Sequence, residues 1–104
     1  MKEALSKLNK LFESKVRLGI MSLLMVEEWV SYAHMKGTLS TKEQPVSDGN
    51  LASHIKKLKE KEYIILKKEF VKNKPLTSYQ ATPAGKKAFE EHLTALEEII
   101  KGIG

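Results

Sequence analysis

The chain has 104 residues, of which 41% are hydrophobic and 30% charged, a composition that fits one compact domain. Because it contains no cysteine, disulfides, thiolate metal sites and cysteine nucleophiles are excluded. No apolar run approaches the roughly 18 residues needed to span a bilayer and no signal-peptide core is present, so a cytoplasmic protein is expected.

The net charge of +5 is concentrated in one segment. Residues 54–74 contain eight lysines and three glutamates, whereas the rest of the chain holds ten basic and ten acidic side chains. A localised excess of this kind indicates a face that binds a polyanion, while a diffuse excess would indicate only a solvated surface.

Helical spacing of apolar residues dominates the first third of the chain. Residues 2–12 predict a helix, because leucines and a phenylalanine recur three to four positions apart. Ser14 is a suitable N-cap for a second helix. Residues 29–31 predict a very short strand, and Ser31 is placed to cap a third helix.

The next helix has the clearest signal in the sequence. Residues 40–46 predict a polar turn, and Ser47 can then cap the free amides of residues 49 and 50. Asp48 suits the positive end of the helix dipole. The helix is expected over about residues 47–61, and its apolar stripe consists of Leu51, Ile55 and Leu58.

After this helix the spacing of the apolar residues changes to the alternation that is typical of strands. Residues 63–70 and 76–81 predict an antiparallel hairpin around an exposed turn at 72–75. Thr82 and Pro83 are typical of a helix start. One side of this last helix carries Phe89, Leu93, Leu96, Ile100 and Ile103.

The order of elements predicts a mainly α fold with a small β-hairpin, that is, a winged helix-turn-helix with extra N- and C-terminal helices. One domain is expected over residues 1–104. It would comprise an N-terminal helix (1–13), a winged-helix core (14–82) and a C-terminal dimerisation helix (83–104).

Two segments are candidates for binding double-stranded DNA. Around the start of the helix at 47–61, small and hydrogen-bonding side chains lie opposite the apolar stripe, as a helix in the major groove requires. In the hairpin, the lysines suit phosphate contacts beside that groove. The alternatives are an ordinary amphipathic surface helix and a solvated hairpin without a ligand.

Three motifs in order resemble the MarR/ArsR-like winged-helix transcriptional regulators of bacterial type. They are Val16-Arg17-Leu18-Gly19-Ile20-Met21-Ser22-Leu23-Leu24, the run from Ser47 to Leu58, and Lys74-Pro75-Leu76-Thr77-Ser78-Tyr79 continuing through Thr82-Pro83-Ala84-Gly85-Lys86. The resemblance covers about residues 12–96. It implies that Asn50, Ser53, His54 and Lys57 approach DNA from the recognition helix, that Lys74 and its neighbours form the wing tip, and that the terminal helices form a dimer.

The full set of residues expected to contact DNA is Ser47, Asn50, Ser53, His54, Lys57, Lys61, Lys68, Lys72 and Lys74. The chain departs from the family pattern in a longer turn at 41–45, in Glu62 where a glycine often ends the recognition helix, and in a wing without arginine. The only arginine, Arg17, is expected to form a structural ion pair. Base readout would then depend on the polar residues and lysines of the helix.

The terminal helices are expected to pair two copies, because their apolar stripes exceed what a small core needs. The interface residues expected are Leu5, Leu8, Phe12, Phe89, Leu93, Leu96 and Ile100, although both helices folding back on their own core is the alternative. Met25 and Trp29 are expected in the core rather than around an effector, and whether an effector exists is open.

The sequence gives little support for an enzymatic function. The three histidines have no ligand-type spacing, there is no glycine-rich phosphate loop, and the single aspartate is explained by its helix start. No enzyme activity, cofactor or metal is therefore expected. Two other functions stay open: a winged-helix module for protein–protein contact, and a non-specific architectural DNA-binding protein.

Overall fold

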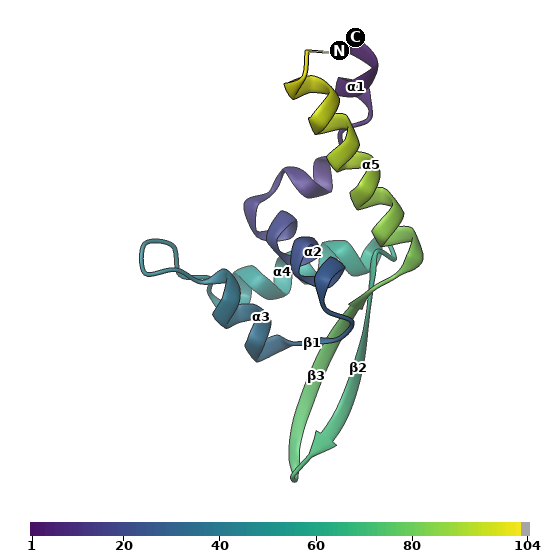
Figure 1. The fold of residues 1–104 in the computed structure, drawn as a ribbon. Helices are drawn as coiled ribbons and strands as arrows, with labels where there is room; N and C mark the ends of the chain where they lie inside the picture. Colours follow the sequence, from purple (N-terminus) through teal and green to yellow (C-terminus); the bar gives the residue numbers. More distant parts are fainter. Residues whose placement is uncertain (103–104) are drawn as a thin grey trace.

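The computed structural model describes residues 1–102 and has the element order of a winged helix between two terminal helical segments (Figure 1). The helical elements are α1 (Lys2–Ser6), the 3-10 turn η1 (Lys10–Glu13), α2 (Lys15–Val26), α3 (Tyr32–Leu39), α4 (Asp48–Glu60) and α5 (Pro83–Ile100). The strands are β1 (Val30–Ser31), β2 (Ile64–Val71) and β3 (Lys74–Ala81). The predicted fold class is confirmed.

Four helices begin where the sequence predicts, because a hydroxyl caps each start. The side chains of Ser14, Ser31, Ser47 and Thr82 each accept a hydrogen bond from the amide three residues further on. Of the two amides expected to donate to Ser47, the one that does so in the described residues is that of Asn50, at 3.1 Å. These caps set the register of α2, α3, α4 and α5, and therefore the face that each helix buries.

The predicted single helix over residues 2–12 is wrong, because the chain breaks between α1 and η1. Asn9 stabilises the break: its amide donates to Nδ1 of His92 at 3.0 Å and its side chain accepts from the amide of Leu11. Phe12 is then buried, with its ring 5.6 Å from that of Tyr63 and 5.2 Å from that of Phe89 between centroids. The break therefore places Phe12 in the core of its own chain.

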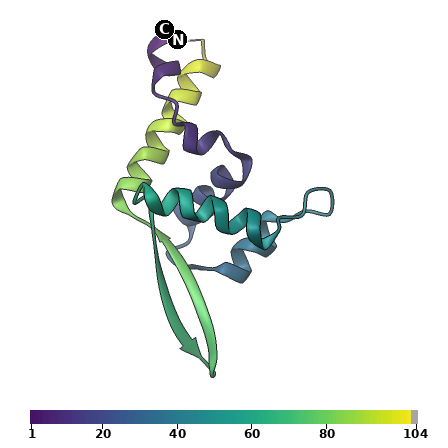
Figure 2. The same ribbon diagram turned by 180° about the vertical axis from the view of Figure 1, so that it is seen from behind.

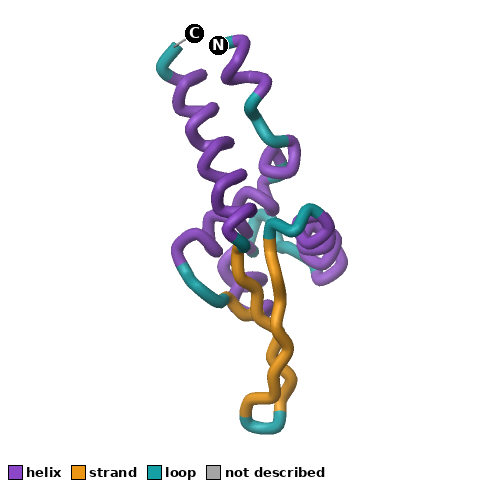
Figure 3. The backbone as a smooth tube through the Cα atoms, turned by 90° about the vertical axis from the view of Figure 1, so that its right-hand side faces the viewer, coloured by secondary structure: helices purple, strands orange, loops and turns teal. Residues whose placement is uncertain are grey.

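The sheet has the order β1-β3-β2, with both neighbouring pairs antiparallel. The turn between β2 and β3 contains only Lys72 and Asn73, both with positive φ (53° and 64°), as in a type I′ hairpin. The predicted turn at 72–75 is too long for this reason, and β3 begins at Lys74. Figures 1 and 3 show the hairpin projecting away from the helices as a long twisted ribbon.

The junction of α4 and β2 is a Schellman motif centred on Glu62. The amide of Tyr63 donates to the carbonyl of Leu58 at 3.0 Å, and that of Glu62 donates to the carbonyl of Lys59 at 2.8 Å. Glu62 has φ 60°, the left-handed conformation that glycine adopts most easily. This explains why a glycine suits this position in the resembling regulators.

The start of α5 lies unusually close to the same junction. A Cβ atom added to Gly85 would lie 2.1 Å from the carbonyl oxygen of Tyr63, so only glycine fits there. The amide of Thr82 donates to that same carbonyl at 3.0 Å. This contact fixes α5 against the point where the hairpin leaves the helices.

The core lies between the helices and the inner half of the hairpin. Its largest fully buried side chains come from η1, α2, β1, α3 and α4; they are Phe12, Ile20, Met21, Leu24, Met35, Leu51, Leu58 and Val30. Met25 packs partly buried against this core, as expected. Trp29 is half-buried, and Nζ of Lys67 lies 4.3 Å from its ring centroid.

Candidate nucleic-acid interface

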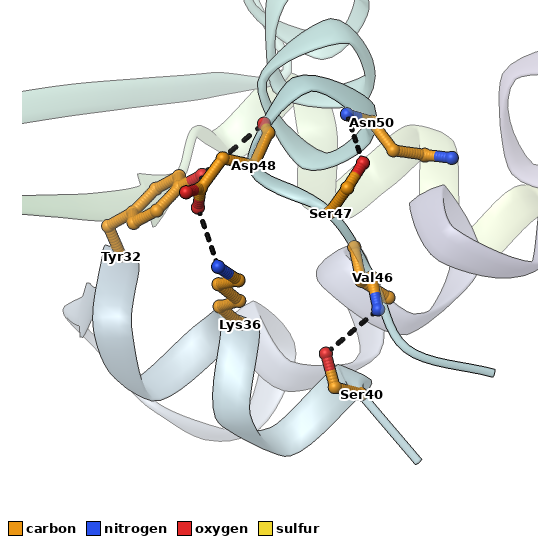
Figure 4. Close-up of polar contacts among 7 residues, drawn as sticks. All are labelled: Tyr32, Lys36, Ser40, Val46, Ser47, Asp48 and Asn50. Carbon is orange, nitrogen blue, oxygen red and sulfur yellow. Dashed lines mark hydrogen bonds and ion pairs between the residues drawn. The ribbon is translucent and has the colours of Figure 1, made fainter. Parts of the chain in front are cut away.

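The N-terminus of α4 is held against α3 by three side chains (Figure 4). The hydroxyl of Tyr32 donates to Oδ1 of Asp48 at 2.9 Å, and Nζ of Lys36 lies 2.9 Å from the same oxygen. The hydrogen bond from Lys36, followed by the one from Tyr32, lowers the pKa of Asp48. Burial, and then the contact with Asp48, raises the pKa of Tyr32. The phenol therefore stays protonated and the carboxylate ionised, which preserves this link between α3 and α4.

The long turn between α3 and α4 does not loosen the two helices. Although residues 41–45 are exposed and project from the body, Val46 is buried. Its amide donates to the hydroxyl of Ser40 at 3.0 Å (Figure 4), and the amide of Gln44 donates to Oγ1 of Thr41 at 2.9 Å. The extra residues form a loop that is closed by these hydrogen bonds, so the relative position of α3 and α4 is fixed.

The side of α4 away from the core carries most of the polar residues singled out in the sequence. Leu51, Ile55 and Leu58 are buried. The expected DNA contacts that are exposed on this helix or at its ends are Ser47, Asn50, Ser53, Lys57 and Lys61. In Figure 2 the helix runs across the front of the molecule with the hairpin below it, so its outer side is open to a ligand.

His54 differs from these residues because it lies on the flank of α4 against α2. Its Nδ1 is 2.7 Å from Nη1 of Arg17, and Nε of Arg17 donates to the carbonyl of Leu11 at 2.6 Å. A guanidinium can only donate, so Nδ1 of His54 must be unprotonated. Burial first, and then Arg17 and Lys57, lower the pKa of His54. The neutral ring therefore links α4 to α2 and η1.

The prediction that Arg17 forms an ion pair is wrong. Within residues 1–102, the side chain of Arg17 bonds to a carbonyl and an imidazole, and no carboxylate pairs with it. The reason is packing: η1 turns the Leu11 carbonyl toward the first turn of α2, where Arg17 lies. The expected structural role of Arg17 nevertheless holds.

A groove of about 360 Å³ separates α4 from the hairpin, and lysines line both of its sides. Lys56 and Lys59 line it from α4, and Lys68 lines it from β2. Thr77 and Tyr32 add hydroxyl groups. Lys56 and Lys59 are not among the DNA contacts expected from the sequence. They lie four and seven positions after Ala52, which also lines the groove. This helical spacing is the sequence signal that places the three residues on one face of α4.

Most lysines of the hairpin are exposed. Lys68, Lys72 and Lys74 are exposed, and within residues 1–102 none of them forms an ion pair. Lys67 instead lies 3.6 Å from the carboxylate of Glu69 and over the ring of Trp29. The outer part of the hairpin therefore carries uncompensated positive charge.

The terminal segments α1 and α5 lie side by side and extend from the body at the opposite end from the hairpin tip (Figures 1 and 3). Phe12 and Phe89 are 1% and 3% exposed within a single chain, so their expected place in a dimer interface is wrong. Leu5, Leu93 and Ile100 are exposed, whereas Leu8 and Leu96 are half-buried. Ile103 lies outside the described residues.

The described part of the chain offers neither a metal site nor a membrane span. Residues 1–102 contain no group of histidine, aspartate and glutamate side chains that could hold a metal ion. No helix in the same range is both long and apolar enough to cross a membrane.

A helix-turn-helix followed directly by an antiparallel hairpin defines the winged-helix class of proteins. Residues 16–100 match the family described as the winged helix DNA-binding domain. The chain belongs to this family, which is one of binding domains and not of enzymes. The resemblance noted in the sequence is confirmed at the level of the winged helix, and its MarR/ArsR-like part stays a prediction.

Several known proteins are similar to the chain over most of its length. An uncharacterized protein of Methanocaldococcus jannaschii is 32% identical over 94 residues, which cover 90% of this chain and 97% of that protein. A transcriptional regulator homologue of Pyrococcus horikoshii has a TM-score of 0.80 and 26% identity, with coverage of 97% and 93%. A putative transcriptional regulator of Thermoplasma acidophilum has a TM-score of 0.69 and 25% identity, with coverage of 83% and 84%.

Proposed function

We propose that the protein is a sequence-specific DNA-binding transcriptional regulator, with α4 in the major groove and the β2–β3 hairpin as a wing on the phosphate backbone. The observation that carries the proposal is the groove between α4 and the wing. Lys56 and Lys59 on one side and Lys68 on the other could all contact one phosphate strand there. The regulators with similar structures support the same function.

The bonding of Arg17 determines what kind of base readout is available. Its guanidinium is engaged by Leu11 and His54, so bidentate arginine–guanine pairing from this chain is not expected. Asn50 and Ser53 are exposed on α4 and can pair with base edges, and an asparagine amide matches adenine best. We infer that Asn50 is the principal base-reading residue and that Lys57 and Lys61 approach the backbone.

The variant Asn50→Ala tests this assignment. Fluorescence anisotropy is measured on a duplex enriched from a random-sequence pool by the protein and on a scrambled duplex. The difference in binding free energy between the two duplexes should decrease by about 1–3 kcal/mol, while the affinity for the scrambled duplex stays the same. Lys57→Ala is the comparison and should weaken both duplexes alike. Equal losses on both duplexes for Asn50→Ala would assign this residue to the backbone.

We further propose that two copies associate through α1 and the outer half of α5. Ile100 is 82% exposed, Leu5 52% and Leu93 44%. Leu5 belongs to α1 and the other two belong to α5, the segments that extend from the body in Figure 1. Leu96 continues the stripe on α5. A winged helix makes few base contacts alone, whereas two copies related by a two-fold axis can read half-sites about one helical turn apart.

Sedimentation of the double variant Leu96→Glu/Ile100→Glu tests the dimer. The wild type should sediment as a dimer at tens of micromolar, roughly a thousandfold above tight operator affinities. The variant should sediment as a monomer and bind DNA more weakly, and Thr94→Glu on the same helix should leave the dimer intact. A monomeric wild type would contradict this part of the proposal.

A non-specific architectural role is the second candidate, and one observation favours it. With Arg17 engaged inside the domain, every exposed basic side chain of the interface is a lysine, which acts as a point charge without directional recognition. Such a protein would bind the enriched and scrambled duplexes equally. A module for protein–protein contact is disfavoured, because the outer side of α4 is polar and charged.

A further inference from the structure

The outer half of the wing exposes an aromatic ring that the fold does not use. Phe70 is 80% exposed, and every residue from 68 to 75 is exposed as well. Its partner across the ladder is Pro75. Because proline has no N–H, this pair occupies a non-hydrogen-bonded position, where facing side chains lie closest. The side chains of Phe70 and Pro75 therefore lie next to each other on one face of the hairpin.

The register places Phe70 on the side of the wing that faces α4. Alternate residues of a strand share one face, so Phe70 shares its face with Lys68, Leu66 and Ile64. Ile64 is buried in the core, and Leu66 and Lys68 line the groove beside α4. Phe70 thus continues this row beyond the groove, toward the hairpin turn at Lys72 and Asn73.

The charges around the ring indicate the kind of partner. Lys68 shares its face, and Lys72 and Lys74 follow at the tip; all three are exposed and lack ion pairs within residues 1–102. The only carboxylate of the wing, Glu69, lies on the opposite face and contacts Lys67. An apolar ring among lysines complements a surface that is anionic outside and apolar within. Stacked bases beneath two phosphate strands have this character.

We propose that Phe70 is a wedge that enters the minor groove beside the major groove occupied by α4, partly unstacks one base step and bends the duplex. Apolar side chains inserted between base pairs act in this way, and the bent duplex then contacts more of the protein. The inference rests on the proposed DNA binding and extends it, because it assigns to the wing a deformation of DNA in addition to phosphate contact. Steps that unstack easily, such as TA, would be favoured under the ring.

The test uses the enriched duplex, about 30 base pairs long with a fluorophore at each end. Energy transfer reports bending, and permanganate reactivity locates unstacked thymines. The wild type should bring the ends closer and create reactive thymines next to the α4 site. Phe70→Ala should abolish both signals and weaken binding about tenfold, with an unchanged salt dependence. Phe70→Leu keeps an apolar wedge and should retain part of the bend, whereas Val71→Ala, on the opposite face, should behave as the wild type.

Four results would overturn the proposal. Binding by the wild type without bending, or equal bending by Phe70→Ala, would remove the wedge and leave the proposed DNA binding intact. Loss of a wild-type dimer in Phe70→Ala, seen by sedimentation, would assign the ring to a contact with a second copy. Failure of the wild type to bind any duplex would instead refute the proposed function, and the wedge with it.

Discussion

Replacing Lys72 and Lys74 together by alanine should reduce the salt dependence of DNA binding without changing the stability of the domain. Both side chains are exposed at the wing tip and form no ion pair within residues 1–102, so the folded protein loses no contact that holds it together. In the proposed complex each ammonium neutralises one phosphate. The variant therefore isolates the electrostatic contribution of the wing.

The size of the effect follows from counterion release. Each phosphate contact contributes about −0.9 to the slope of log K against log salt concentration, so two lost contacts should flatten the slope by about 1.8 for each bound protomer. Between about 50 and 200 mM salt, each contact accounts for a loss of about 3.5-fold in affinity. For a dimer with both wings on DNA, the slope should change by about 3.6.

Anisotropy titrations at four or five salt concentrations measure the slope, and thermal unfolding of the free proteins checks stability. Lys86→Ala/Lys87→Ala is the matched control, because it removes the same charge from exposed positions at the start of α5. The control should lower affinity slightly through net charge and keep most of the slope. If the wing variant keeps the wild-type slope, or if the control flattens it equally, the wing does not lie on the backbone.

Four further changes test the fold itself. Gly85→Ala should destabilise the domain by about 3 kcal/mol or more, since the new methyl would meet a backbone carbonyl. Gly37→Ala in α3 should stabilise the domain by about 1 kcal/mol, because the added Cβ would meet nothing within 4 Å. Equal changes in thermal unfolding for Gly85→Ala and Gly37→Ala would contradict the packing described. Glu62→Gly should stabilise by about 1 kcal/mol by relieving the left-handed conformation, and a loss on denaturant unfolding would refute this. Burial lowers the pKa of His92 despite the opposing effect of Glu13, so the unfolded chain binds more protons and stability should fall as pH drops below about 6.5; an NMR-titrated pKa at or above that value would contradict this.

Much of the fold could be predicted because its signals are local. A hydroxyl followed by an apolar stripe marks the starts of α2, α3, α4 and α5, and the cap and stripe depend on residues within a few positions of each other. The signal for the hairpin is equally local. The turn is shorter than predicted because Lys72 adopts a positive φ, which its residue type disfavours.

The errors lie where distant residues decide the outcome. The break before η1 depends on Asn9 bonding to His92, 83 positions away, and no local pattern contains that contact. The pairing of His54 with Arg17 spans 37 positions, so an imidazole predicted to face DNA was found to link two helices. The residues expected at the dimer interface included Phe89, because periodicity alone does not distinguish the core of one chain from a surface shared by two.

The same limit applies to the binding surface. The sequence identified a basic segment and a capped helix, but which flank of α4 faces the wing depends on how the hairpin packs. Lys56 and Lys59 are candidate contacts because the packing places their flank of α4 along the groove.

Sequence-specific binding of DNA by α4 and the wing is tested by comparing an enriched duplex with a scrambled one. The full-length protein is used to enrich duplexes from a random-sequence pool. Affinities for the enriched duplex and its scrambled counterpart are then compared by anisotropy at about 150 mM salt. The enriched duplex should bind at least about 10³-fold more tightly than the scrambled one. Equal binding to both duplexes, or binding to neither, would contradict it.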